Sequence, residues 1–167
     1  MTLTLILTRH AKSAWDDPTQ DDFDRTLNGR GRRSAVALGQ WLAEAGHLPD
    51  DVVVSAAART VETWSRMAPH LPSTATMKSN PALYLASPDT MLNVIKSESA
   101  RTLMLIGHNP GIAELASRLV KSPPGDRRFR DYPTGATTVM HFEAEGWNDV
   151  GPGQGVVSDF VVPRDLL

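Results

Sequence analysis

The chain has 167 residues, of which 41% are hydrophobic and 22% are charged, and its formal net charge is -2. This length predicts one domain, residues 1–167, and the small charge does not indicate nucleic acid or a membrane surface as partner. Because cysteine is absent, thiol nucleophiles, disulfides and thiolate metal sites are excluded. No apolar run approaches the ~20 residues of a membrane span, and the amino terminus lacks the basic start of a signal peptide. We therefore expect a cytoplasmic protein.

A short apolar run at residues 3–8 predicts the first strand. It consists of Leu, Thr and Ile and ends at the charged pair Arg9 and His10. Such a run is typical of a buried strand in an α/β sheet, where the site lies beyond the carboxyl ends of the strands. Arg9 and His10 therefore stand where chemistry is expected, one as an anion-binding group and the other as a nitrogen nucleophile or base.

The next segments predict a loop, a helix and a second strand. Residues 14–25 are acidic and polar, and we interpret them as a solvated loop near the site. Asn28 is a candidate N-cap for a helix that has apolar residues at helical spacing and ends near Gly46. Residues 51–54 predict a second buried strand, which leads into another helical pattern with Arg59 near its start.

The second half of the chain continues this alternation. Residues 71–81 predict a loop with a short strand, and Pro88 is expected to open a helix. A third apolar run at 102–106 ends in Gly107-His108-Asn109-Pro110-Gly111 before another helical pattern. An irregular basic stretch follows at 123–130, then two strands at 137–142 and 156–162. This order predicts an α/β fold, a three-layer α/β/α sandwich with a mostly parallel central sheet.

The three strand–helix junctions bring two histidines and two arginines to one edge of the predicted sheet. Guanidinium groups suit the charged oxygens of a phosphoryl group. A neutral imidazole can attack phosphorus, and water can then hydrolyse the phosphohistidine that forms. The pattern therefore predicts an anion site with a nitrogen nucleophile or base, and phosphoryl transfer is a chemistry that its four residues could carry: Arg9, His10, Arg59 and His108. No two histidines have a compact metal-ligand spacing, so we expect neither a metal nor another cofactor.

These motifs resemble those of the histidine phosphatase superfamily, which includes the cofactor-dependent phosphoglycerate mutases. The resemblance rests on three segments in order: Thr8-Arg9-His10-Ala11-Lys12-Ser13, then Ser55 to Thr63 with Arg59, then Gly107-His108-Asn109-Pro110-Gly111. The small size and the third segment are most similar to the compact SixA-type phosphohistidine phosphatases. The resemblance implies the same phosphoglycerate mutase-like sandwich.

The resemblance also implies roles for individual residues. It makes His10 the nucleophile and His108 a donor to the phosphate oxygens, with Arg9 and Arg59 binding the phosphate. Further candidates for substrate contact are Ser13, Arg25 and Asn109.

The chain departs from the family in the segment before the third motif. Many members carry an acid there that protonates the leaving oxygen, whereas residues 82–87 contain no carboxylate. The nearest acids, Asp89 and Glu98, are expected to face solvent on a helix. General acid catalysis is worth about 10²- to 10⁴-fold, and a basic alkoxide needs it more than the departing imidazole of phosphohistidine. The missing acid therefore favours phosphohistidine, or another activated phosphate, over sugar phosphates. A smaller departure is Ala11, where the family usually has Gly.

We therefore predict a metal-independent phosphatase that acts through phospho-His10 on phosphohistidine of a signalling protein. The short chain leaves little room for a lid, which favours an open pocket. Arg127, Arg128 and Arg130 could rim it and steer acidic partners, or they could simply form a solvated basic loop. Two alternatives stay open. One is a phosphatase for small phosphorylated molecules, such as activated, sugar or nucleotide phosphates. The other is a non-catalytic phosphate-binding module. Nothing in the pattern requires more than a monomer.

Overall fold

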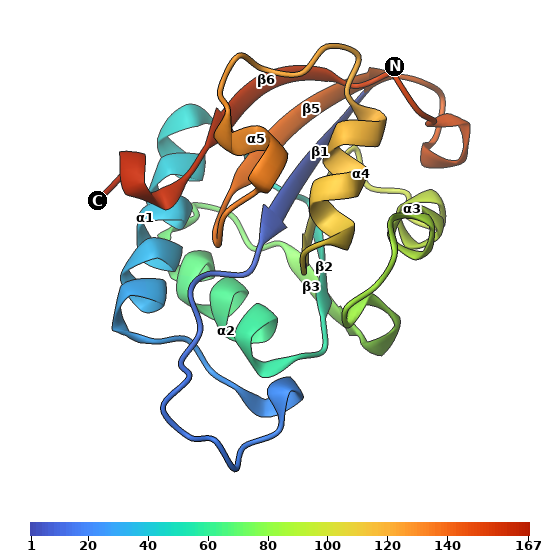
Figure 1. Cartoon of the computed structure of the whole chain (residues 1–167). Coiled ribbons are helices and arrows are strands. Elements are labelled where there is room, and N and C mark those ends of the chain that lie inside the picture. Colours follow the sequence, from blue (N-terminus) through green and yellow to red (C-terminus); the bar gives the residue numbers. More distant parts are fainter.

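The computed structural model describes all 167 residues and contains one six-stranded sheet with helices on both of its faces (Figure 1). The strands are β1 (Thr2–Arg9), β2 (Asp51–Ser55), β3 (Thr76–Asn80), β4 (Thr102–Gly107), β5 (Thr137–Glu143) and β6 (Val156–Val161). The helices are α1 (Gly29–Ala45), α2 (Ala58–Met67), α3 (Pro88–Lys96), α4 (Gly111–Leu119) and the short α5 (Arg128–Asp131). None of them combines the length and the apolar character that a membrane-crossing helix needs.

The strand order across the sheet is β3-β2-β4-β1-β5-β6. Neighbouring strands from β3 to β1 are parallel, β5 is antiparallel to β1, and β6 is antiparallel to β5. Only β5 therefore runs against the other five strands, and the prediction of a mostly parallel sheet in an α/β sandwich is confirmed. This topology places the carboxyl ends of β1, β2 and β4 side by side at one edge of the sheet.

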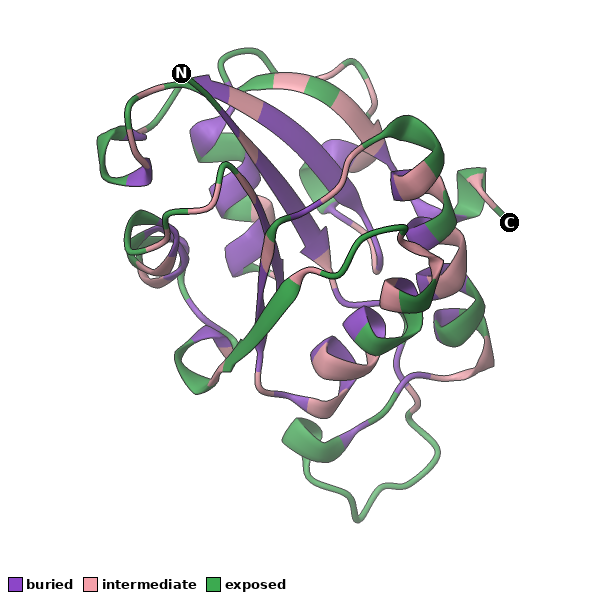
Figure 2. Cartoon of the chain, turned by 180° about the vertical axis from the view of Figure 1, so that it is seen from behind, coloured by how far each residue is buried: buried purple, intermediate pink, exposed green.

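Both faces of the central strands are buried. In β1, Leu3, Leu5 and Leu7 pack in the hydrophobic cluster that includes α3 and α4. Ile6 lies in the cluster on the other face, with α1 and α2. Figure 2 shows this burial along the central strands, in contrast to the exposed edge strand β3. Because side chains alternate between two covered faces, such a strand appears in the sequence as a continuous apolar run.

The elements expected from the sequence are present, with one difference. The helix that begins after Asn28 is confirmed, since the Asn28 side chain accepts a hydrogen bond of 2.8 Å from the Gly31 N–H. It ends at Gly46, whose φ of 77° is left-handed and therefore suits glycine. The basic stretch at 123–130 is not wholly irregular, because α5 begins within it, at Arg128.

The start of α1 packs directly on the backbone that follows β1. A Cβ atom added to Gly31 would lie 2.0 Å from the carbonyl oxygen of Lys12. The same oxygen accepts a hydrogen bond of 3.0 Å from the Asn28 N–H. Glycine is a poor helix former, but here only glycine allows the helix to approach this closely. The contact fixes the path of the chain immediately after His10.

Candidate active site

The two histidines of the predicted site meet because β1 and β4 are adjacent and parallel. Arg9, the last residue of β1, is in register with Gly107, the last residue of β4. The next residue on each strand is a histidine, and the His10 N–H donates to the Gly107 carbonyl at 3.1 Å. The rings of His10 and His108 are 5.3 Å apart between centroids. Sheet topology alone therefore pairs two residues that are far apart in the sequence.

The hydrogen bonds of His10 define which ring nitrogen is available for chemistry. Its Nδ1 lies 2.7 Å from the Ala11 carbonyl oxygen, which only accepts, so Nδ1 carries the hydrogen. Its Nε2 lies 3.4 Å from Nε of Arg59, which only donates. Nε2 is therefore the unprotonated nitrogen, and its lone pair accepts a long hydrogen bond from Arg59.

Arg59 lies in the first turn of α2, and its guanidinium joins both histidines. Besides the contact of its Nε with His10, its Nη2 lies 3.3 Å from Nδ1 of His108. The side chain is buried, with 3% exposure. A fixed and permanently charged group thus faces the space between the two rings.

His108 is held from its other side by Ser55, at the end of β2. The Ser55 hydroxyl lies 2.7 Å from His108 Nε2 and also accepts a bond of 3.3 Å from the Ala57 N–H. Because Arg59 donates to Nδ1 of His108, Nε2 carries the hydrogen and donates to Ser55. Sequence reasoning assigned no role to Ser55, since nothing in a sequence indicates that a serine on β2 contacts a histidine after β4.

Burial and positive charge keep both histidines neutral. Burial lowers the pKa of His10 to about 3, with a further contribution from the charge of Arg59, although the hydrogen bond to Ala11 opposes the shift. Burial and then the charge of Arg59 lower the pKa of His108 to about 4. At neutral pH the His10 lone pair is therefore not blocked by a proton.

Arg9 and Asn109 are anchored to the same stretch of backbone at the edge of the pocket. The Arg9 Nη1 donates to the Tyr132 carbonyl at 3.1 Å, and the Asn109 amide donates to the carbonyls of Asp131 and Tyr132 at 3.0 Å. The Nε of Arg9 and the Oδ1 of Asn109 are buried and have no partner in the protein. Buried polar atoms without partners are uncommon, and Nε of Arg9 is a donor that a bound anion would satisfy.

Ser13 and Arg25 form a second group of linked residues that line the pocket. Arg25 donates through Nη1 to the Ser13 hydroxyl and, at 3.2 Å, to the Ala14 carbonyl. Its guanidinium lies 3.4 Å from the ring centroid of Trp15. These contacts fold the loop after β1 back toward the site.

Asp22 belongs to the site as well, and sequence reasoning missed it. Its carboxylate accepts from Arg25 at 2.9 Å, from Arg59 at 3.0 Å and from the hydroxyl of Tyr84. Burial alone would raise the pKa of Asp22, but the hydrogen bonds from Tyr84, Arg25 and Arg59 outweigh it and hold that pKa well below its usual range. The acidic loop is therefore not simply solvated, because one of its carboxylates is bound by two arginines of the site.

One pocket of about 280 Å³ collects these groups. All seven residues singled out in the sequence line it: Arg9, His10, Ser13, Arg25, Arg59, His108 and Asn109. The other lining residues are Lys12, Trp15, Leu85 and Thr134. The pocket therefore presents three guanidiniums, one ammonium and two neutral imidazoles to a ligand, which suits an anion.

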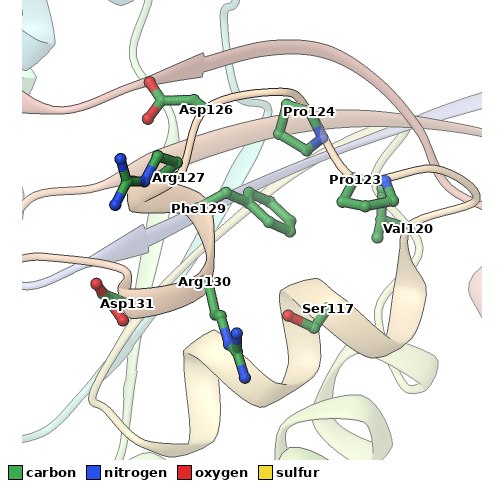
Figure 3. Close-up of a pocket in the computed structure, with 9 residues that line it drawn as sticks. All are labelled: Ser117, Val120, Pro123, Pro124, Asp126, Arg127, Phe129, Arg130 and Asp131. Atoms are coloured by element: carbon green, nitrogen blue, oxygen red, sulfur yellow. The ribbon is translucent and has the colours of Figure 1, made fainter.

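The expectation that three basic residues rim this pocket is wrong. Arg128 is bound by two carboxylates, at 2.7 Å from Asp126 and 2.9 Å from Asp165. Arg127 and Arg130 line a separate pocket of about 700 Å³ between α4 and α5, which Figure 3 shows. None of the three lines the pocket that contains His10.

Neither acid that follows the predicted catalytic segment reaches the pocket. Asp89 is exposed, as expected, and forms an ion pair of 2.6 Å with Arg118. Glu98 was also expected to face solvent, but its side chain is only 10% exposed and pairs with Lys78 at 2.7 Å. The segment before β4 therefore contributes Tyr84 and Leu85 to the surroundings of the site, and no carboxylate.

Comparison with known proteins agrees with this arrangement. A family model described as histidine phosphatase superfamily, branch 1, matches residues 5–83. An uncharacterised protein of Mycobacterium leprae is 31% identical over 165 residues, which cover 93% of this chain and 99% of that protein. The chain belongs to the histidine phosphatase superfamily. This histidine phosphatase is also 36% identical over 129 residues to an uncharacterised chloroplast protein of Arabidopsis thaliana, and the match covers 69% of this chain but only 58% of the plant protein.

A solved structure resembles the whole of this histidine phosphatase. It is assigned as the phosphohistidine phosphatase SixA of Nakamurella multipartitia, with 29% sequence identity and a TM-score of 0.81. The similarity covers 98% of this chain and 97% of that one. The predicted fold and the resemblance to SixA-type members are confirmed, and by family the chain is a phosphatase.

Proposed function

We propose that this histidine phosphatase removes the phosphoryl group from phosphohistidine of a signalling protein, without a metal ion, through a phosphorylated His10. The observation that carries the proposal is the orientation of His10. Its Nδ1–H is held by the Ala11 carbonyl, and its unprotonated Nε2 faces Arg59 and the pocket. A nucleophile needs an unprotonated lone pair, which supports His10 Nε2 in this role once Arg59 turns its donors from the histidine to the phosphoryl oxygens.

In the first step, the lone pair of His10 Nε2 attacks phosphorus. A bond forms between Nε2 and phosphorus, and the bond between phosphorus and the substrate imidazole breaks. The departing imidazole nitrogen takes a proton from solvent. Arg9 and Arg59 stabilise the charge on the phosphoryl oxygens, which is the main requirement for catalysis of phosphoryl transfer.

In the second step, water attacks the phosphorus of phospho-His10. The new oxygen–phosphorus bond replaces the bond to Nε2, a proton passes from the water to solvent, and inorganic phosphate leaves. His108 supports both steps as a donor to phosphate. In the structure His108 Nδ1 accepts from Arg59. When Arg59 binds the phosphate instead, the ring can change tautomer, because the Ser55 hydroxyl can donate to Nε2 as well as accept from it, and Nδ1–H is then presented to a phosphate oxygen without a gain of charge.

The groups around the pocket support phosphohistidine rather than an alkyl phosphate as substrate. The carboxylate nearest to the site, Asp22, is ionised because its pKa lies well below the usual range. Tyr84 directs its hydroxyl hydrogen to that carboxylate, and the hydrogen bond raises the pKa of Tyr84. No strong acid is therefore poised to protonate a leaving alkoxide, whereas imidazole departs with much less help.

The test is a phosphatase assay in the presence of EDTA. The substrates are a phosphohistidine peptide, p-nitrophenyl phosphate and a sugar phosphate, each with wild type and with the His10→Ala variant. We expect turnover of phosphohistidine to exceed that of the sugar phosphate by orders of magnitude and to disappear in the variant. A labelled phosphoenzyme that is stable to alkali and labile to acid should be trapped with wild type only.

Several outcomes would contradict the proposal. Turnover that survives in His10→Ala would exclude the covalent mechanism, and loss of activity with EDTA would exclude metal independence. Efficient hydrolysis of the sugar phosphate would favour a small-molecule phosphatase with an acid supplied from elsewhere. Phosphate binding without turnover of any substrate would favour a non-catalytic phosphate-binding module.

A further inference from the structure

A second pocket, of about 300 Å³, adjoins the active site. Lys12 and Thr134 line both pockets, so the two share a wall. The second pocket is also lined by Arg30 in the first turn of α1, Ser34 one turn further on, and Arg164 after β6. We call these five residues the basic annex.

The cations of the basic annex are free to bind an anion. Lys12, Arg30 and Arg164 are exposed, and none of them forms an ion pair within the chain. Arg128 also borders the pocket, but its guanidinium is occupied by two carboxylates. One acid, Asp131, lines the pocket as well. Three unpaired cations against one carboxylate leave the annex with a positive potential.

Ser34 places a hydroxyl in the wall of the annex. The residue is 3% exposed and lines the pocket. A serine in a helix commonly bonds to a preceding carbonyl, but the Ser34 hydroxyl forms no side-chain hydrogen bond within the protein. It is therefore a further donor that the annex offers to an anion, beside its three cations.

We propose that the basic annex binds a carboxylate of the substrate protein, close to its phosphohistidine. This inference rests on the proposed function and names the partner as a protein with an acidic surface around the phosphorylated residue. A phosphohistidine side chain carries a single phosphoryl group, so the second anion is a carboxylate of the protein. Exposed Lys and Arg side chains, rather than buried ones, suit a transient protein contact that is guided by charge.

Apolar side chains at the mouth of the active site also favour a protein partner. Trp15 and Leu85 line that pocket, and they are 76% and 55% exposed. Large apolar residues that border a site and remain open to water mark interaction surfaces, where Trp in particular contributes to binding. A small phosphate would leave both side chains exposed, whereas a protein surface would cover them.

The experiment compares two phosphohistidine peptides of equal length, one flanked by Glu and the other by Gln at the same positions, with phosphoramidate as the small substrate. The enzymes are wild type, Arg30→Glu, Arg164→Glu and Ser34→Ala.

Arg33→Glu is the control. Arg33 is an exposed cation on α1, like Arg30, but it lines a different pocket. We expect wild type to prefer the Glu peptide by kcat/KM. Each charge reversal in the annex should reduce that preference by about five-fold or more.

The control variant and phosphoramidate distinguish an effect on peptide docking from an effect of the changed net charge of the enzyme. Arg33→Glu should keep the wild-type preference, and phosphoramidate turnover should change no more in the annex variants than in Arg33→Glu. The preference should also decrease with added salt, since exposed charges are screened. Ser34→Ala should weaken the preference without any change in charge.

Three results would overturn the inference. The first is equal kcat/KM values of wild type for the two peptides. The second is a loss of the preference for the Glu peptide in Arg33→Glu as large as in the annex variants. The third comes from adding a bisphosphorylated small molecule as a further substrate: the annex variants would lose turnover of that molecule but keep the preference for the Glu peptide. The proposed function fails in a different way. In that case wild type would hydrolyse neither peptide nor phosphoramidate.

Discussion

At the scale of single residues, Ser55 links the end of β2 to the histidine after β4. We expect Ser55→Ala to lower kcat/KM for phosphoramidate by about ten-fold, which corresponds to a lost hydrogen bond of ~1.4 kcal/mol. The reason is that His108 Nε2 loses its only partner, so that the ring is held by Arg59 alone. Steady-state kinetics would measure the effect. Ser158→Ala is a matched control, because that hydroxyl bonds to the Val139 carbonyl on β5. An equal decrease in the control would contradict the role of Ser55.

Leu85 has an unfavourable backbone conformation at the edge of the active site. Its φ is 50°, in the left-handed region, and its side chain is 55% exposed. Asn tolerates this region better than Leu, so we expect Leu85→Asn to raise the free energy of unfolding by about 1 kcal/mol. Thermal unfolding should show an increase in Tm of about 2–4 °C. Leu85→Ala removes the same exposed apolar side chain without relieving the backbone, and a similar gain in that variant would disprove the explanation.

The sequence was sufficient to predict seven of the eleven residues that line the pocket, but not all of their contacts. Arg9, His10 and His108 stand directly at the ends of parallel strands, and such ends meet at one edge of a sheet. Asp22 could not be recognised in this way. It is one of five aspartates between residues 14 and 25, and only the path of the folded loop shows which of them contacts Arg59.

At the scale of elements, the close contact between α1 and the chain after His10 leaves no room for an added side chain. A Cβ atom at Gly31 would lie 2.0 Å from a backbone oxygen, whereas one at Gly29 would meet only a side chain, at 3.5 Å. We therefore expect Gly31→Ala to lower the free energy of unfolding by about 2 kcal/mol or more, as overpacking does. Gly29→Ala should be neutral or raise it by up to ~1 kcal/mol, because alanine favours a helix.

Urea unfolding of the two alanine variants measures the difference. Activity should change in parallel, since Gly31→Ala displaces Lys12 and with it the backbone that holds His10. Equal unfolding midpoints for the two variants would show that the contact does not constrain the helix.

The long elements could be predicted because their apolar residues repeat with the period of a buried strand or of an amphipathic helix. The four-residue α5 could not, because it is too short to show a period. A local pattern also cannot reveal an ion pair between distant residues, and this explains the wrong expectation that Arg128 rims the active-site pocket. Its partner Asp165 is 37 residues away, and local sequence contains no signal of such a pair.

At the scale of the whole molecule, the buried histidines make stability depend on pH. The pKa values of His10 and His108 are lowered to about 3 and about 4 in the folded protein, whereas an unfolded histidine titrates near ~6.5. Between these values the unfolded chain binds more protons, so the free energy of unfolding falls as pH decreases. Each histidine contributes a slope of up to about 1.4 kcal/mol per pH unit.

Urea unfolding between pH 4.5 and 7 would measure this slope. The stability should be fully present above pH ~6.5 and decline steadily below it. His108→Gln should flatten the curve, because glutamine does not titrate. His70→Gln is the control, since His70 lies outside the active-site pocket. A slope that is the same in wild type and His108→Gln would contradict the assignment.

The bond between Asp22 and Arg59 has a consequence for product inhibition. The Asp22 carboxylate already accepts from the guanidinium of Arg59, so every phosphate must compete with an internal anion. A substrate protein can offset that cost with its other contacts, but free inorganic phosphate cannot. We therefore expect phosphate to leave quickly and to inhibit weakly. Asp22→Asn should lower the inhibition constant of phosphate by about two- to five-fold, as expected when a partly exposed charge is removed. Turnover at high phosphate concentration would then slow in the variant and not in wild type.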